Sequence, residues 1–169
     1  MKQNEKRNDP PKECITVETP LGVLVIMAQE GSVRSIGLVQ SGADEIAKDS
    51  AASNVLRQTA RELKEYFAGN RTEFTIPMQA EGTPFQQKVW QALRQIPYGE
   101  TKSYGEIASM IGQPKASRAV GMACNRNPIM ITVPCHRVVG AKGALVGYAY
   151  GTGIKQKLLA LEQRTISKI

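Results

Sequence analysis

The most reactive side chains of this 169-residue chain lie together in one short stretch, Pro134-Cys135-His136-Arg137. The sequence holds three cysteines and a single histidine, and that histidine directly follows Cys135. A thiolate is the strongest nucleophile that a side chain offers near neutral pH, but a free thiol titrates near roughly 8.5 and needs a base or a cation to activate it. The pair therefore predicts nucleophilic chemistry at Cys135, with a buried and inert cysteine as the alternative.

The apolar run 129–133 precedes this pair and reads as a strand. Because adjacent side chains of a strand point to opposite sides, His136 can serve Cys135 only if the chain turns there or if a water molecule carries the proton. Taken singly, Asn127-Pro128 is an ordinary turn, and Glu162, in a helix predicted over 155–163, is an ordinary solvated carboxylate.

The basic charge of the chain is confined to its second half. Residues 83–169 hold 12 Lys and Arg against 3 Asp and Glu, a net charge of +9, whereas residues 1–82 hold 10 against 12, a net charge of −2. This asymmetry favours an acidic polymer as the partner, with a solvated lysine-rich surface as the alternative.

The remaining composition excludes several classes of protein. No run approaches the roughly 18 apolar residues of a membrane span, and the polar amino terminus lacks the apolar stretch of a secretory signal, so we expect a cytoplasmic protein without membrane contact. No metal site is expected, because no CxxC or HxxxH spacing is formed by Cys14, Cys124, Cys135 and His136.

The first half is predicted to be a small sheet with a helix. Residues 1–12 read as a disordered tail. Three segments rich in Val and Ile are separated by turn residues and predict an antiparallel meander over 14–19, 22–29 and 32–39. Helical spacing of apolar residues predicts a helix over 54–69, and residues 72–78 read as one more strand.

The second half is predicted to consist of short helices. Capping boxes begin two of them, one from Thr83 to Gln86 and one from Ser103 to Glu106, and Ile107, Met110 and Ile111 are expected on the inner side of the second. A break with glycine and proline leads to a third helix over 116–124, which suggests a helix-turn-helix. The alternative is an unrelated helical subdomain.

The sequence contains five short motifs: RAVG at 118–121, NP at 127–128, PCHRV at 134–138, GY at 147–148 and KxxLLxxE at 155–162. Together they resemble one family, the O6-alkylguanine-DNA alkyltransferases. The resemblance covers about residues 83–164 and, more weakly, the amino-terminal sheet. It implies an α+β fold, in which a ribonuclease H-like domain at 13–80 precedes a winged helix-turn-helix-like domain at 81–169 that binds DNA and accepts the alkyl group.

The resemblance also implies a role for each of five side chains. Cys135 would attack the carbon on O6 of the damaged guanine, and His136 would take the thiol proton through water. Glu162 would orient His136, Asn127 would hold the turn, and Tyr104 would donate to a ring nitrogen of the base. No cofactor is implied, and each molecule would act once.

The implied partner is double-stranded DNA, bound through its minor groove by a monomer, with the alkylated guanine rotated out of the stack. Arg118 would fill the gap in the stack. The other DNA-binding positions would be Ser117, Ala119 and Gly121.

The base pocket implied by the resemblance is walled by Tyr148, Val138 and Ala149. Tyr150 stands where this family usually has glycine, so we expect a bulky side chain to narrow the pocket against large adducts. Cys124 also departs from the family pattern and is expected to be structural.

Three other functions remain open from the sequence. A module that binds alkylated DNA without repairing it would share the fold but lack the cysteine. A cysteine hydrolase would use the same Cys-His pair but leaves the charge asymmetry unexplained, and a helix-turn-helix regulator leaves PCHRV without a role.

Overall fold

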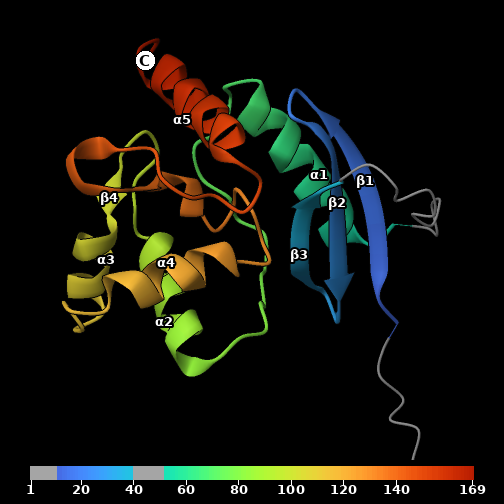
Figure 1. The fold of residues 1–169 in the computed structure, drawn as a ribbon. Helices are drawn as coiled ribbons and strands as arrows, with labels where there is room; N and C mark the ends of the chain where they lie inside the picture. Colours follow the sequence, from blue (N-terminus) through green and yellow to red (C-terminus); the bar gives the residue numbers. More distant parts are fainter. Residues whose placement is uncertain (1–10, 40–51) are drawn as a thin grey trace, which may run out of the picture.

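The structure, a computed structural model, describes residues 11–39 and 52–169. Most of the predicted tail over 1–12 therefore lies outside the described residues. The structure has a sheet with one helix in its first half and mainly helices in its second half, as Figure 1 shows. This arrangement confirms the predicted α+β fold class.

The predicted meander is present as a sheet in the order β1-β2-β3. Its strands are β1 (Glu13–Thr19), β2 (Gly22–Gln29) and β3 (Ser32–Leu38), and both pairings are antiparallel. Alternate residues of β2 are buried, as the two-residue period of a strand requires. The helix α1 (Asn54–Phe67) covers this apolar face and buries Leu56 and Leu63 against it.

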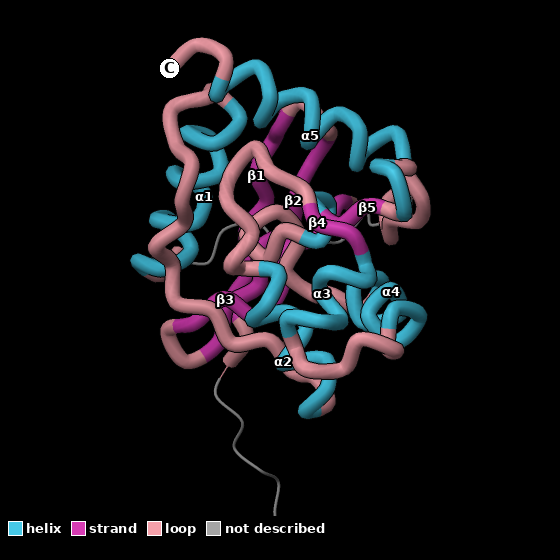
Figure 2. The backbone as a smooth tube through the Cα atoms, turned by 90° about the vertical axis from the view of Figure 1, so that its left-hand side faces the viewer, coloured by secondary structure: helices cyan, strands magenta, loops and turns pink. Residues whose placement is uncertain are grey.

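The second half contains four α-helices and a two-stranded parallel sheet among the described residues. The helices are α2 (Pro84–Leu93), α3 (Tyr104–Met110), α4 (Ser117–Asn125) and α5 (Thr152–Ile166). The strands β4 (Lys102–Ser103) and β5 (Val138–Val139) are short, as are the 3-10 turns η1 (Cys135–Arg137) and η2 (Ala141–Gly143). Figure 2 shows α3 and α4 side by side, and both predicted capping boxes are formed, at Thr83 and at Ser103.

Two predicted strands are wrong. The segment 72–78 pairs with β3 only at one bridge, between Val33 and Met78, because Pro77 has no N–H with which to extend a ladder. The run 129–133 forms one bridge, between Ile36 and Ile129, and then turns back on itself. Its apolar residues are buried because the turn lies inside the core.

One predicted core residue is also misplaced. Met110 is 44% exposed at the end of α3, whereas Ile107 of the same helix is fully buried. The helix is only two turns long, so its last residue extends past the surface that it covers.

The two halves are joined at the carboxyl end of β3 and between α1 and α5. Ile36 donates a backbone hydrogen bond to Pro128 and accepts one from Met130, at 3.0 Å each. On the other side, Tyr66 of α1 reaches Glu162 of α5, the helix drawn next to it in Figure 1. In the described part of the chain, no helix has the length and apolar character needed to cross a membrane.

Candidate active site

Cys135 lies at the start of the turn η1, where it is 5% exposed. Asn127 holds this turn: its side-chain nitrogen donates to the Val133 carbonyl at 2.9 Å and to the sulfur of Cys135 at 3.3 Å. Its side-chain oxygen accepts from the backbone N–H of Ile129 at 3.0 Å. One amide side chain therefore fixes both ends of the loop that carries the sulfur.

This loop contains a strained residue. Ile131 has a φ of 72°, in the left-handed region that branched side chains rarely adopt. Such a conformation costs on the order of 1–3 kcal/mol and persists only where the surroundings enforce it. The bonds from Asn127 and the burial of the loop provide that enforcement and fix the position of the sulfur.

His136, which follows Cys135 in the turn, is fully buried and bonded to a carboxylate. Its Nε2 lies 3.0 Å from Oε1 of Glu162, which is also fully buried. Because an ionised carboxylate only accepts hydrogen bonds, Nε2 carries the proton and Nδ1 is left with its lone pair. Nδ1 has no hydrogen-bond partner within residues 11–39 and 52–169.

Glu162 accepts from three side chains. Besides His136, the Nη2 of Arg137 donates to it at 2.6 Å and the hydroxyl of Tyr66 at 3.1 Å. Burial by itself would raise the pKa of Glu162, but the hydrogen bonds from His136 and Arg137, together with the positive charge of Arg137, lower it to about 2. The carboxylate is thus ionised at any physiological pH.

Burial also decides the protonation of the other two groups. It lowers the pKa of His136, against the opposing effect of Glu162, so the imidazole is neutral near pH 7. It raises the pKa of the Cys135 thiol, while the hydrogen bond from Asn127 and the charge of Lys155 lower that pKa. A neutral imidazole with a free Nδ1 can accept the proton that the thiol must lose.

Tyr148 and Tyr150, two of the predicted pocket residues, lie near the sulfur of Cys135. Val138 is buried, Tyr148 and Tyr150 are partly buried, and Ala149 is exposed. Burial raises the pKa of Tyr148, and the proximity of Cys135 raises it further. The hydroxyl of Tyr104 donates to the Val146 carbonyl at 3.0 Å, so Tyr104 contacts the same loop from α3.

The predicted DNA-binding residues lie on α4. Arg118 and Ala119 are exposed, and Ser117 is partly buried at the start of the helix. Gly121 faces inward instead: a Cβ at this position would lie 3.7 Å from the Tyr104 ring. Met122, which the sequence analysis does not single out, is 65% exposed one turn after Arg118.

Comparison with known proteins shows the family of the chain. Residues 84–164 match the model described as 6-O-methylguanine DNA methyltransferase, DNA binding domain. Residues 12–80 match 6-O-methylguanine DNA methyltransferase, ribonuclease-like domain. The chain belongs to the 6-O-methylguanine DNA methyltransferase family.

Individual members of this methyltransferase family are similar over most of their length. The methylated-DNA–protein-cysteine methyltransferase of Methanosarcina acetivorans is 49% identical over 147 residues, which cover 86% of this chain and 94% of that protein. The constitutive methylated-DNA–protein-cysteine methyltransferase of Bacillus subtilis is 47% identical over 156 residues, which cover 88% of this chain and 93% of that protein. The Mycobacterium tuberculosis OGT, solved in complex with DNA, is 46% identical and has a TM-score of 0.80. The match covers 89% of this chain and 92% of that chain.

Two supporting residues of this methyltransferase were not predicted from the sequence. Arg137 belongs to the motif PCHRV, which by itself assigns it no role, although a charged residue next to a buried apolar run is a signal for one. Tyr66 lies in a helix that the apolar spacing predicts, and nothing local indicates a partner 96 positions away.

Lys155 also had no predicted role. It is fully buried, and its Nζ donates to the carbonyl oxygens of Val146 at 3.3 Å and Gly147 at 3.1 Å. Burial lowers the pKa of this lysine. The same carbonyl of Val146 accepts from Tyr104, so two side chains hold the loop that leads to the pocket.

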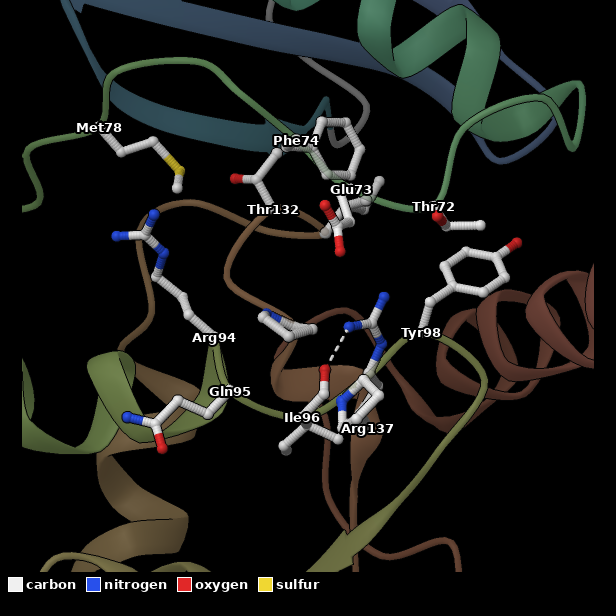
Figure 3. A pocket seen from close by; sticks show the side chains of 13 residues that line it. Thr72, Glu73, Phe74, Met78, Arg94, Gln95, Ile96, Tyr98, Thr132 and Arg137 are labelled. Atoms are coloured by element: carbon white, nitrogen blue, oxygen red, sulfur yellow. Dashed lines mark hydrogen bonds between the residues drawn. The ribbon is translucent and has the colours of Figure 1, made fainter.

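A cavity of about 350 Å³ lies behind the turn, and Figure 3 shows it. Arg137 borders it and donates to the Ile96 carbonyl at 2.8 Å, the bond drawn there as a dashed line. The lining includes Thr132 and Pro134 but not Cys135 or Tyr148. This cavity is therefore separate from the pocket expected for the alkylated base.

Proposed function

We propose that this methyltransferase repairs DNA by moving the alkyl group of O6-alkylguanine to the sulfur of Cys135. The observation that carries the proposal is the buried turn with Cys135 and His136, in which Asn127 is bonded to the sulfur and Glu162 of α5 is bonded to His136. The set provides a nucleophile, a proton acceptor and a residue that orients the acceptor.

The reaction is a single displacement. The thiol proton passes through a water molecule to Nδ1 of His136, and the sulfur attacks the alkyl carbon. A carbon–sulfur bond forms as the carbon–O6 bond breaks, and its electron pair stays on the base. The base then gains a proton and leaves as neutral guanine, so the thiol loses one proton and the base gains one.

Tyr104 acts on the leaving base. Burial raises the pKa of Tyr104 to about 12, so its hydroxyl stays protonated and is a donor. It donates to the Val146 carbonyl here, and a short rotation would direct it to a ring nitrogen of a bound guanine. Donation to the base stabilises the negative charge that develops there in the transition state.

DNA reaches the site through α4. The exposed Arg118, with the small residues around it, suits close approach to a minor groove and insertion of one side chain into the stack. Extruding the alkylated nucleotide costs on the order of a few kcal/mol, which contacts of Arg118 would offset. We propose that a monomer performs this step, with residues 81–169 as the DNA-binding and acceptor domain and residues 13–80 as its support.

The test is incubation with a duplex that contains one O6-methylguanine, followed by intact mass measurement and peptide mapping. We expect one methyl group per chain, located on Cys135, and no further transfer with excess DNA. Cys135→Ser should show none, whereas Cys124→Ser, which removes another buried thiol, should still be methylated.

The alternatives give different outcomes in the same test. A binding module would retain the duplex without a gain in mass, and a hydrolase would release its adduct to water. Methyl transfer that persisted in Cys135→Ser would overturn the assignment of the acceptor.

A further inference from the structure

The side chain of Tyr150 reaches from the pocket to the first half of the protein. A Cβ built on Gly37 of β3 would lie 3.0 Å from the hydroxyl of Tyr150. The ring of Tyr150 also packs edge-on against Tyr148, with 5.9 Å between the ring centroids. Tyr150 therefore stands between the sheet and the pocket wall.

Gly37 is needed for space and not for its backbone conformation. Its φ lies outside the left-handed region, and it pairs regularly with Val25 of β2. A side chain would be compatible with the strand but would displace the hydroxyl of Tyr150 by a few tenths of an ångström. Burial raises the pKa of Tyr150, while a hydrogen bond with the Leu38 backbone lowers it, which also places the hydroxyl at this end of β3.

The same end of β3 holds the loop that carries the nucleophile. Ile36, next to Gly37, exchanges backbone hydrogen bonds with Pro128 and Met130, and Asn127 then links this loop to the sulfur. Two consecutive residues of β3 thus make different contacts: Ile36 with the loop that carries the nucleophile, and Gly37 with Tyr150. The strand fixes the separation between the sulfur and this part of the pocket wall.

We propose that β3 holds Tyr150 at the pocket through Gly37, and that this contact between the two halves limits the size of the alkyl group that Cys135 accepts. The inference rests on the proposed function and adds a specificity residue, Tyr150, and a positioning residue, Gly37. A methyl group needs little room beyond the sulfur, whereas a benzyl group must occupy the space next to the ring of Tyr150.

The experiment compares single-turnover transfer from matched duplexes that contain O6-methylguanine or O6-benzylguanine. Tyr150→Gly should raise the benzyl-to-methyl rate ratio by roughly tenfold or more, the discrimination that a few carbon atoms give in an apolar pocket. Tyr150→Phe keeps the ring but removes the hydroxyl near β3 and should raise the ratio less. Gly37→Ala should lower it, because the methyl group pushes Tyr150 toward the pocket.

The matched control is Gly153→Ala, since that glycine has open space around it and no left-handed φ. It should leave the ratio unchanged. The decisive result is coupling: the effect of Gly37→Ala should vanish when Tyr150 is replaced by glycine. The proposal is overturned if Tyr150→Gly leaves the ratio unchanged, or if Gly37→Ala has the same effect in both backgrounds.

Thermal unfolding of the same variants separates this proposal from the proposed function. Gly37→Ala and Tyr150→Phe should show non-additive changes in Tm if the contact exists, whether or not alkyl groups are transferred. Additive changes would contradict the contact. If no variant or parent received either group, the proposed function and the size limit would both be wrong, and the coupling in Tm would still report on the contact.

Discussion

At the scale of single residues, the carboxylate of Glu162 organises the site. It is fully buried and accepts from His136, Arg137 and Tyr66. A buried charge is tolerated only while its partners are present, and the same holds for the guanidinium that faces it. Removing any one of the four side chains therefore leaves a buried polar group of another without its partner.

Replacing Glu162 with glutamine should harm both stability and activity. The buried Arg137 loses its counter-ion, so we expect the free energy of unfolding to fall by about 3–5 kcal/mol. His136 loses the negative charge that stabilises its protonated form when it takes the thiol proton, so the rate of methyl transfer should fall roughly 100-fold or more. Urea unfolding and single-turnover transfer measure the two effects, with the exposed Glu100→Gln as control. A fully active and stable Glu162→Gln would contradict this role.

The lowered pKa of Glu162 predicts an acid-sensitive stability. Its pKa falls from the ordinary 4.5 to about 2 in the folded chain, so between these two pH values the unfolded chain binds more protons than the folded chain. The stabilisation is complete above about pH 4.5 and is lost as the pH falls toward 2. Urea unfolding at several pH values should show a shallower slope over this range for Glu162→Gln than for the parent. Equal slopes would show that the carboxylate is not the group responsible.

At the scale of elements, local signals were sufficient for some segments and not for others. Both capping boxes were correctly predicted, because a cap depends on residues three positions apart. The run 129–133 was misread as a strand because a buried turn and a buried strand are equally apolar. The turn is held by the side chain of Asn127 and by backbone hydrogen bonds of the neighbouring residues with β3. A hydrophobic pattern indicates neither of these interactions.

The helix α4 gives a prediction of its own. If Arg118 fills the stack, Arg118→Ala should slow transfer from a methylated duplex by roughly tenfold or more, since extrusion costs a few kcal/mol. Transfer from the free base O6-methylguanine should change less than about twofold, because no stack has to be opened. Lys168→Ala, beyond the end of α5, removes an equal charge as a control. An equal loss on both substrates would place Arg118 in the chemistry of the site instead.

At the scale of the whole molecule, the net positive charge lies in the half that contains α2 to α5. The net +9 of residues 83–169 belongs to the half that contains α3 and α4, and the first half is slightly acidic. The sequence itself was sufficient to predict this division of charge, whereas Cys135, His136 and Glu162 were grouped only through the family resemblance, and the structure brings His136 and Glu162 into contact. The sequence was not sufficient to reveal the contacts of Ile36, Gly37 and Tyr66 with the second half, because those join positions far apart in the chain.

The charge division predicts salt-dependent DNA binding. Lys and Arg that contact phosphates release bound counter-ions, so affinity should fall by about tenfold or more between 50 and 200 mM salt. Fluorescence anisotropy with unmodified duplexes of different sequence measures this, and the fall should be similar for each duplex. Affinity that did not change with salt would exclude phosphate contacts as the main source of binding.

The contacts of Tyr66 and β3 with the reactive turn also bear on how the protein is made. The sheet and α1 are synthesised before Cys135, and α5, which supplies Glu162, is synthesised after it. A nascent chain that has just produced its cysteine has the support from the first half but still lacks the carboxylate that orients His136. Glu162 can therefore orient His136 only after α5 has been synthesised and has docked, so the complete site forms late in biosynthesis.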